Sequence, residues 1–197
     1  MKVLVLEPHA DDAAIGCGGT IARLVEEEHT VWSFICTKRT YGDYIKETTD
    51  AFRLLGVGYY TPLNYDVRLL VEHRQQILDD LIEMKKAFHP DIVLLPSPTD
   101  VHQDHSVVAQ EGVRAFMDCS VLGYEAPRNE PQTHHTMFYE ITEKQLDKKV
   151  NAINCYVSQL EGRLQMGEDF IRSLAKIRGA QIGKKYAEAF TVYRYIQ

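Results

Sequence analysis

Two short runs rich in apolar residues, VLVL at residues 3–6 and DIVLL at residues 91–95, constrain the fold of this chain most strongly. Continuous rather than alternating hydrophobicity is typical of β-strands that are covered on both faces, as in parallel sheets. Apolar residues at helical spacing follow elsewhere, notably over residues 69–88. Because strands alternate with helices, we predict a three-layer α/β/α, Rossmann-like fold with a mostly parallel sheet and a ligand site at the carboxyl ends of its strands.

Periodicity and turn residues predict the remaining elements. Helices are expected over residues 20–29, 43–55, 105–117, 143–160 and 167–182. Strands are expected over residues 31–36, 59–60, 121–125 and 137–141. Gly56 stands where a left-handed C-cap would end the second helix. The stretch GCGGT at residues 16–20 fails as a dinucleotide-binding loop, since Ile21 occupies the place of the third glycine, so we expect its glycines to allow close backbone packing.

The composition indicates one globular domain over residues 1–197. Hydrophobic residues make up 45% of the chain and charged residues 25%, which excludes a disordered or fibrous protein. The net charge of −6 argues against nucleic acid or an anionic membrane as a partner. No run approaches the ~18 apolar residues of a transmembrane helix, and the N-terminal run is too short for a signal peptide, so a cytoplasmic protein is expected. The four cysteines are widely spaced and are expected to be reduced thiols.

Two polar clusters, PHADD at residues 8–12 and HQDH at residues 102–105, lie just beyond the two apolar runs. Because parallel strands end on one edge of a sheet, residues about 95 positions apart can share one crevice. Catalytic zinc takes three nitrogen or oxygen ligands and keeps a fourth position for water. His9, His105 and either Asp11 or Asp12 would satisfy this requirement. The competing structural interpretation is that Asp12 and Asp104 merely cap the helices that follow.

Several residues near the same edge are weaker candidates for substrate binding. Arg39, Tyr41 and Arg68 fall after predicted strands or in loops, and Arg68 is the preferred one. His134 and His135 precede a predicted strand and are candidates for a rim contact. Solvated surface residues are the alternative explanation for each of them.

The clusters resemble those of the LmbE-like, or PIG-L, superfamily of zinc-dependent de-N-acetylases, which carry an AHPDDE-like run after the first strand and an HPDH-like run after a central one. The resemblance extends along the chain in order. Its further elements are Glu47, Ala51, Leu55 and Gly56, the PxDxHxDH run at residues 98–105, Ser158-Gln159, and YAEAF at residues 186–190. This family resemblance implies a single deacetylase domain.

The resemblance also implies roles for the cluster residues. His9, Asp12 and His105 match the zinc ligands, and Asp11 matches the general base. Zn²⁺ is the expected metal, although Fe²⁺ can fill such a site. The implied reaction is hydrolysis of a linear amide that removes an acetyl or similar small acyl group from an amino sugar, a glycoside of one or a related amine.

The remaining implied roles concern the transition state. His102 would stabilise the oxyanion or act as the acid, with Asp104 supporting it and Arg68 binding substrate. Either Asp11 or His102 could protonate the leaving amine. A homo-oligomer is compatible with the sequence.

The chain departs from the family pattern at three positions, and two other functions stay open. Ala10 replaces the usual proline, Ala13 the usual glutamate, and Tyr44 stands where many members carry a substrate-binding arginine. These changes keep the ligand positions but leave the substrate undefined. The alternatives are a metal-dependent phosphoesterase, which would often use two metals, and a zinc-binding module without turnover.

Overall fold

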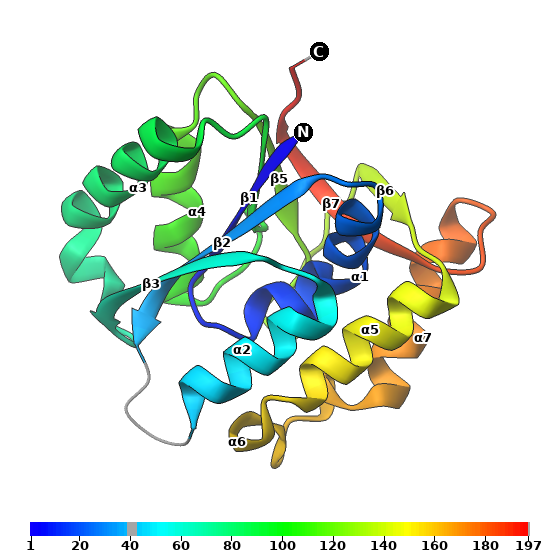
Figure 1. Cartoon of the computed structure of the whole chain (residues 1–197). Coiled ribbons are helices and arrows are strands. Elements are labelled where there is room, and N and C mark those ends of the chain that lie inside the picture. The colour runs from blue at the N-terminus through cyan, green and yellow to red at the C-terminus, as the bar shows by residue number, and fades with distance from the viewer. Residues whose placement is uncertain (39–42, 197) are drawn as a thin grey trace.

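A seven-stranded sheet organises the chain in the computed structural model, which describes residues 1–38 and 43–196 (Figure 1). The strands are β1 (Lys2–Glu7), β2 (Thr30–Lys38), β3 (Tyr59–Asp66), β4 (Ile92–Pro96), β5 (Ser120–Tyr124), β6 (Met137–Glu140) and β7 (Ala187–Arg194). Their spatial order is β3-β2-β1-β4-β5-β7-β6. The first five are parallel, whereas β7 runs antiparallel to both of its neighbours.

Helices cover both faces of this sheet, which confirms the predicted α/β/α layering (Figure 1). One face carries α1 (Asp12–Glu26), α2 (Tyr44–Leu55), α5 (Glu143–Asn154), α6 (Val157–Leu160), η2 (Leu164–Met166) and α7 (Glu168–Gln181). The other face carries η1 (Leu70–His73), α3 (Arg74–Phe88) and α4 (Gln103–Ala115). Among the described residues, no helix is both long and apolar enough to span a membrane.

Strand β1 shows why its sequence is continuously apolar. Val3 and Val5 pack into the core beneath α1, α2 and α5, whereas Leu4 and Leu6 pack into the core beneath α3 and α4. All four side chains are fully buried. A strand that faces two cores has no side left for polar residues, so its alternation disappears.

Helix α1 begins eight residues earlier than the periodicity predicted. The glycine-rich stretch lies inside it, and Cys17 departs from helical geometry with φ −141° and ψ 23°, which kinks the helix. A Cβ at Gly16 would lie 2.5 Å from the ring of Tyr124, and one at Gly19 would lie 2.6 Å from Ile141. The glycines therefore provide the expected close packing, and tertiary contacts outweigh their poor helix propensity.

Other boundaries differ in smaller ways. The segment expected as one helix over residues 143–160 is divided into α5 and α6, and residues 69–88 divide into η1 and α3. Strand β3 is eight residues long rather than two, and Pro62 is tolerated because β3 is an edge strand. Gly56 has φ 81°, which confirms the left-handed cap of α2. All four cysteines are free thiols, and Cys155 alone is not fully buried.

Candidate active site

The loop between β1 and α1 is folded tightly by its own polar groups. The carboxylate of Asp12 accepts a hydrogen bond from the backbone N–H of His9 at 2.7 Å, and the N–H of Asp12 donates to the carbonyl of His9 at 3.1 Å. From the segment between α5 and α6, the buried Tyr156 hydroxyl donates to the carbonyl of Ala10 at 2.5 Å. The directions of the His9 and Asp12 side chains are therefore fixed by local hydrogen bonds.

Three side-chain atoms from the two clusters converge on one point. His9 Nδ1 lies 3.1 Å from Asp12 Oδ2, His105 Nε2 lies 3.2 Å from the same oxygen, and the two nitrogens are 3.3 Å apart. Ligands at 2.0–2.1 Å from a tetrahedral zinc ion are separated from one another by about 3.3 Å. The triangle therefore has the size and the nitrogen and oxygen donors that fit a zinc ion and leave a fourth position open.

Each histidine of this triangle is oriented by a buried carboxylate on its other nitrogen. His9 Nε2 lies 3.0 Å from Asp104 Oδ2, and His105 Nδ1 lies 2.5 Å from Asp100 Oδ2. Such partners fix the tautomer of a ligating histidine and make it a better donor to metal. Sequence reasoning gave no role to Asp100, although it lies in the PxDxHxDH run that carried the family resemblance.

The structure corrects the expected environment of Asp104. Its carboxylate contacts His9 and accepts a hydrogen bond from the backbone N–H of Arg68 at 2.7 Å, whereas its hydrogen bond to His102 comes from the backbone N–H. The helix-capping interpretation is also wrong for both aspartates. Asp11 is the N-cap residue of α1, and His102 is that of α4, where its Nδ1 accepts from the N–H of Asp104 at 3.1 Å.

His102 lies beside the triangle. The centroid of its ring is 4.6 Å from the centroid of the His105 ring. One ring nitrogen from each of His9, His102 and His105 lies within 4.8 Å of the other two, so this histidine cluster could also hold a metal. Burial lowers the pKa of His102, and the neighbouring His105 and His9 lower it further. Because Nδ1 accepts a hydrogen bond, the neutral ring carries its proton on Nε2.

The other titrating groups of the site are strongly coupled. Burial by itself would lower the pKa of His105, but Asp12 and Asp100 outweigh it and raise this pKa to about 10. The pKa of His9 is raised against the effect of burial, because Asp12 and Asp104 lie beside its ring. Burial would raise the pKa of Asp12, but His105 and His9 hold it well below its usual value. A divalent cation entering the triangle would displace protons from the histidines.

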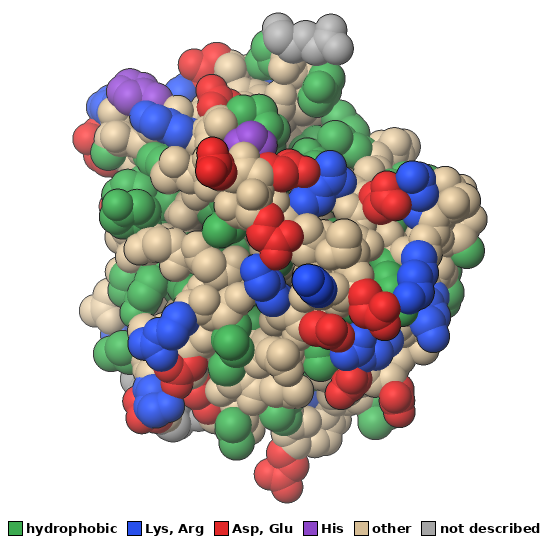
Figure 2. Space-filling model, turned by 45° about the vertical axis from the view of Figure 1, so that its right-hand side comes forward, with side chains coloured by type: hydrophobic (Ala, Val, Ile, Leu, Met, Phe, Trp, Pro, Cys, Tyr) green, Lys and Arg blue, Asp and Glu red, His purple; other side chains and the backbone are tan. Residues whose placement is uncertain are grey.

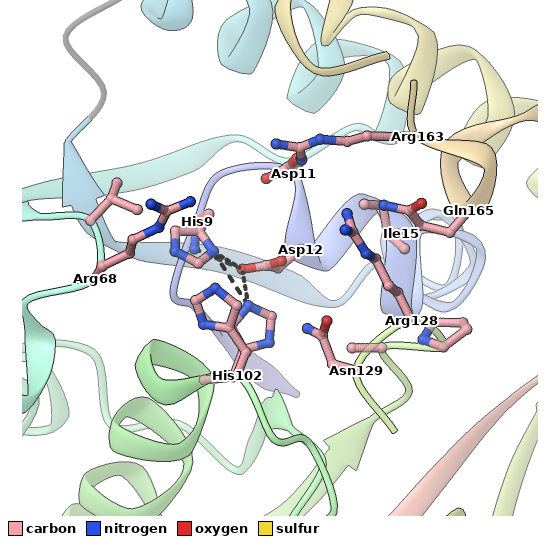
Figure 3. Close-up of a pocket in the computed structure, with 14 residues that line it drawn as sticks. His9, Asp11, Asp12, Ile15, Arg68, His102, Arg128, Asn129, Arg163 and Gln165 are labelled. Atoms are coloured by element: carbon pink, nitrogen blue, oxygen red, sulfur yellow. Dashed lines mark hydrogen bonds and ion pairs between the residues drawn. The ribbon is translucent and has the colours of Figure 1, made fainter. Parts of the chain in front are cut away.

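A cavity of about 370 Å³ opens over these groups (Figure 3). Asp11, which is buried, lines it and lies 3.3 Å from a guanidinium nitrogen of Arg163. Arg68, for which substrate binding stays a prediction, lines the cavity, and so do Arg128, Arg163, Asn129 and Gln165, which sequence reasoning missed. Arg128, Asn129 and Arg163 lie in loops and Gln165 lies in the short helix η2, and none of these positions carries a local motif that predicts a site.

The other candidates for substrate binding do not line this cavity among the residues that the structure describes. Arg39 and Tyr41 lie outside the described residues. His134 and His135 do not line the cavity, and the ring of His135 lies 3.3 Å from Glu125 instead. The predicted rim contact of this pair is therefore wrong.

Comparison with known proteins places this site in a family. The model of the PIG-L family, described as GlcNAc-PI de-N-acetylase, matches residues 4–116, which is more than half of the chain and includes both polar clusters. Diacetylchitobiose deacetylase of Thermococcus kodakarensis is 25% identical over 218 residues, covering 95% of this chain and 81% of that protein.

Two solved structures show the same fold. A conserved protein from Thermus thermophilus has a TM-score of 0.81 at 23% identity, covering 99% of this chain and 96% of that one. GalB, the 4-carboxy-2-hydroxymuconate hydratase of Pseudomonas putida, has a TM-score of 0.80 at 19% identity, covering 100% of this chain and 97% of that one. At such identities the likeness concerns the fold alone. The family match, over the residues that form the metal-sized triangle, shows that this chain belongs to the PIG-L, or LmbE-like, family.

Proposed function

We propose that residues 1–197 form one metal-dependent amidohydrolase domain that removes an acetyl or similar small acyl group from an N-acylated amino sugar or related amine. The triangle of His9 Nδ1, Asp12 Oδ2 and His105 Nε2 is the observation that carries this proposal. Family membership and the deacetylase relative support the amide as the bond that is cleaved. Zinc is the proposed metal, with iron(II) as the alternative.

Zinc in such a site would polarise the amide carbonyl and lower the pKa of water to about 7. His9, Asp12 and His105 would hold it, while Asp104 and Asp100 keep the two histidines in the required tautomers. Asp11 lines the same cavity without belonging to the triangle, and in this proposal its carboxylate accepts the proton that the attacking water loses. Arg163 holds this carboxylate in place.

His102 completes the proposed machinery on the other side of the cavity (Figure 3). Its Nε2–H would donate to the oxyanion that forms as water adds to the carbonyl carbon. When the C–N bond breaks, the amine leaves with a proton from either Asp11 or His102, and the acyl group leaves as a carboxylic acid. A general acid at this step is worth roughly 100- to 10,000-fold in rate.

The test is to measure bound metal and acetate release together. Asp11→Asn is expected to keep its metal and lose most of its turnover, whereas His9→Ala is expected to lose both. His102→Ala should keep its metal with reduced turnover. Equal loss of metal in all three variants would contradict this division of roles, and full activity in His102→Ala would remove that residue from the mechanism.

Phosphoester hydrolysis is the second candidate, because three arginines line the cavity and arginine pairs well with phosphate. One metal per chain with amine release favours the amidase, whereas phosphate release favours the phosphoesterase. Bound metal without any turnover would leave a zinc-binding module. Cytoplasmic location and homo-oligomerisation stay predictions.

A further inference from the structure

Three arginines line the cavity, although the chain as a whole is acidic. The net charge is −6, and on the face shown in Figure 2 acidic and basic side chains are interspersed. By contrast, Arg68, Arg128 and Arg163 all line the one cavity that contains the candidate site. They come from three separate segments, following β3, β5 and α6. Such convergence of like charges is unfavourable unless an anion or a neighbouring carboxylate offsets it.

Two of these arginines are not paired with a carboxylate in the part of the chain that the structure describes. Arg163 is paired with Asp11, but the guanidinium groups of Arg68 and Arg128 make no hydrogen bond or ion pair with any described residue. Elsewhere in the described chain arginines are engaged, as Arg53 is with Asp50. In Figure 3, Arg68 and Arg128 approach from opposite sides of the histidines. Their donors are therefore available to a ligand held over the site.

The backbone of Arg68 is fixed in an unusual conformation. Its φ of 71° lies in the left-handed region, which is unfavourable for a residue with a side chain and persists only when the surroundings impose it. The surroundings here are the first turn of α4. The N–H of Arg68 donates to Asp104, and its carbonyl accepts from the side-chain amide of Gln103. Arg68 is thus attached to the same turn that carries His105.

The turn that presents Arg128 is also built from internal hydrogen bonds. The N–H of Asn129 donates to the carbonyl of Ala126 at 2.8 Å, and the N–H of Ala126 donates to the buried carboxylate of Glu130 at 2.7 Å. The N–H of Val101, from the loop after β4, donates to the carbonyl of Asn129 at 3.1 Å. Arg128 is therefore an exposed arginine on a fixed turn, which loses less entropy on binding than one on a loose loop.

We propose that Arg68 and Arg128 bind an acidic group of the substrate, so that the preferred substrate is an N-acylated amine carrying a carboxylate or a phosphate. This inference rests on the proposed amidase function and specifies its substrate class. A guanidinium group matches either anion with two parallel hydrogen bonds, which gives orientation as well as affinity. An acidic group held between the two arginines would leave the amide to lie over the triangle.

The experiment compares substrates that share one amide and differ in charge. The neutral probes are N-acetylglucosamine and its methyl glycoside, and the acidic probes are its 1-phosphate, its 6-phosphate and its carboxymethyl glycoside. We expect kcat/KM for at least one acidic probe to exceed that of the matched neutral probe by about tenfold or more. Release of free amine and of phosphate is measured in parallel.

Variants then assign the preference to the two arginines. Arg68→Gln and Arg128→Gln are each expected to lower kcat/KM for the acidic probe about tenfold or more, mainly through KM, and to lower it less for the neutral probe, so that the ratio of acidic to neutral kcat/KM falls. The lysine variants should recover part of the loss. Arg53→Gln, which removes an exposed arginine on α2, is the matched control and should change neither value. Circular dichroism checks that each variant is folded.

Calorimetric binding of glucosamine and glucosamine 6-phosphate separates failure of this inference from failure of the proposed function. Equal kcat/KM for acidic and neutral probes, with equal binding, would overturn the anionic substrate and leave the amidase intact. No amine release with any probe would refute the amidase. In that case tighter binding of the phosphate that depends on both arginines would still support the anion site, and arginine-independent binding would overturn it.

Discussion

This molecule contains two clusters of buried ionisable side chains that differ in the role we assign to them. Near the middle of α1, the carboxylate of Glu188 accepts from Lys149 Nζ at 2.6 Å and from the N–H groups of Gly19 and Thr20 at 2.9 and 2.6 Å. Those N–H groups follow the kink at Cys17, so the carboxylate satisfies donors in the interrupted stretch of helix. Every charge in this cluster has a partner, and we assign it a structural role.

The His9–Asp12–His105 cluster differs in its geometry. Its ligand atoms surround a common centre, whereas the carboxylate of Glu188 is surrounded by N–H donors. Three atoms face a common centre, and a cavity of about 370 Å³ opens above them. Asp104 Oδ1 is buried without a hydrogen-bond partner in the described structure. Buried charge alone therefore does not identify a candidate site. The distinguishing feature is that the potential ligand atoms face an open cavity.

The largest expected effect breaks the converging cluster. His105→Ala removes one corner of the triangle and the partner of Asp100, so we expect loss of bound metal and a fall in kcat of more than about 1000-fold. Metal analysis and acetate release measure the two effects. His134→Ala, an exposed histidine outside the cavity, is the control. A metal-loaded, active His105→Ala enzyme would contradict the ligand assignment.

The structural cluster should respond in stability instead of activity. Lys149→Met leaves the buried carboxylate of Glu188 without its counter-charge, which should cost about 3–5 kcal/mol of unfolding free energy. Denaturant unfolding measures this loss, and metal content should stay unchanged at a temperature where the variant is folded. Lys144→Met, at an exposed position of the same helix, should have little effect. Loss of metal without loss of stability would reverse the two assignments.

We expect a third buried group, the carboxylate of Glu125, to make the free energy of unfolding depend on pH. Burial would raise the pKa of Glu125, but His135 and Arg178 outweigh it and lower that pKa to about 2. Because the folded-state pKa lies below the usual 4.5, this carboxylate contributes stability above pH 4.5 that is lost as the pH falls toward 2. The contribution is at most roughly 3 kcal/mol.

Unfolding curves between pH 2 and 6 test this dependence. Glu125→Gln should be less stable than the original protein at pH 6, and the difference should shrink as the pH falls through that window. Glu83→Gln, an exposed carboxylate change, supplies the baseline. A constant difference across the whole range would show that Glu125 is not the titrating group.

The smallest expected effect concerns Asp100, the carboxylate that orients the ligand His105. Asp100→Asn keeps the size of the side chain and removes the charge that orients His105, so metal affinity should fall about 10- to 100-fold. Competition with a chelator measures the affinity. Asp118→Asn, at an exposed position, should leave it unchanged. An unaltered affinity in Asp100→Asn would mean that backbone geometry alone orients the histidine.

The sequence predicted the structure best where an apolar run with the pattern of a buried strand is followed directly by a cluster of polar residues. The runs of β1 and β4 and the clusters that follow them were predictable, because buried parallel strands have a distinct composition and end on one edge. The start of α1 was not predictable, because helix propensity contains no information on the close approach of Gly16 to Tyr124. Nor were Arg128 and Arg163, which reach the site from loops whose positions depend on the whole fold.

The hydrogen bond from Tyr156 to Ala10 joins the beginning of the candidate site to a residue made much later during translation. A nascent chain that ends before residue 156 already contains every proposed metal ligand, yet lacks the hydroxyl that fixes the carbonyl between His9 and Asp11. We therefore expect a truncated chain to bind metal weakly and to hydrolyse nothing. Assembly of the working centre would then be among the last events of biosynthesis.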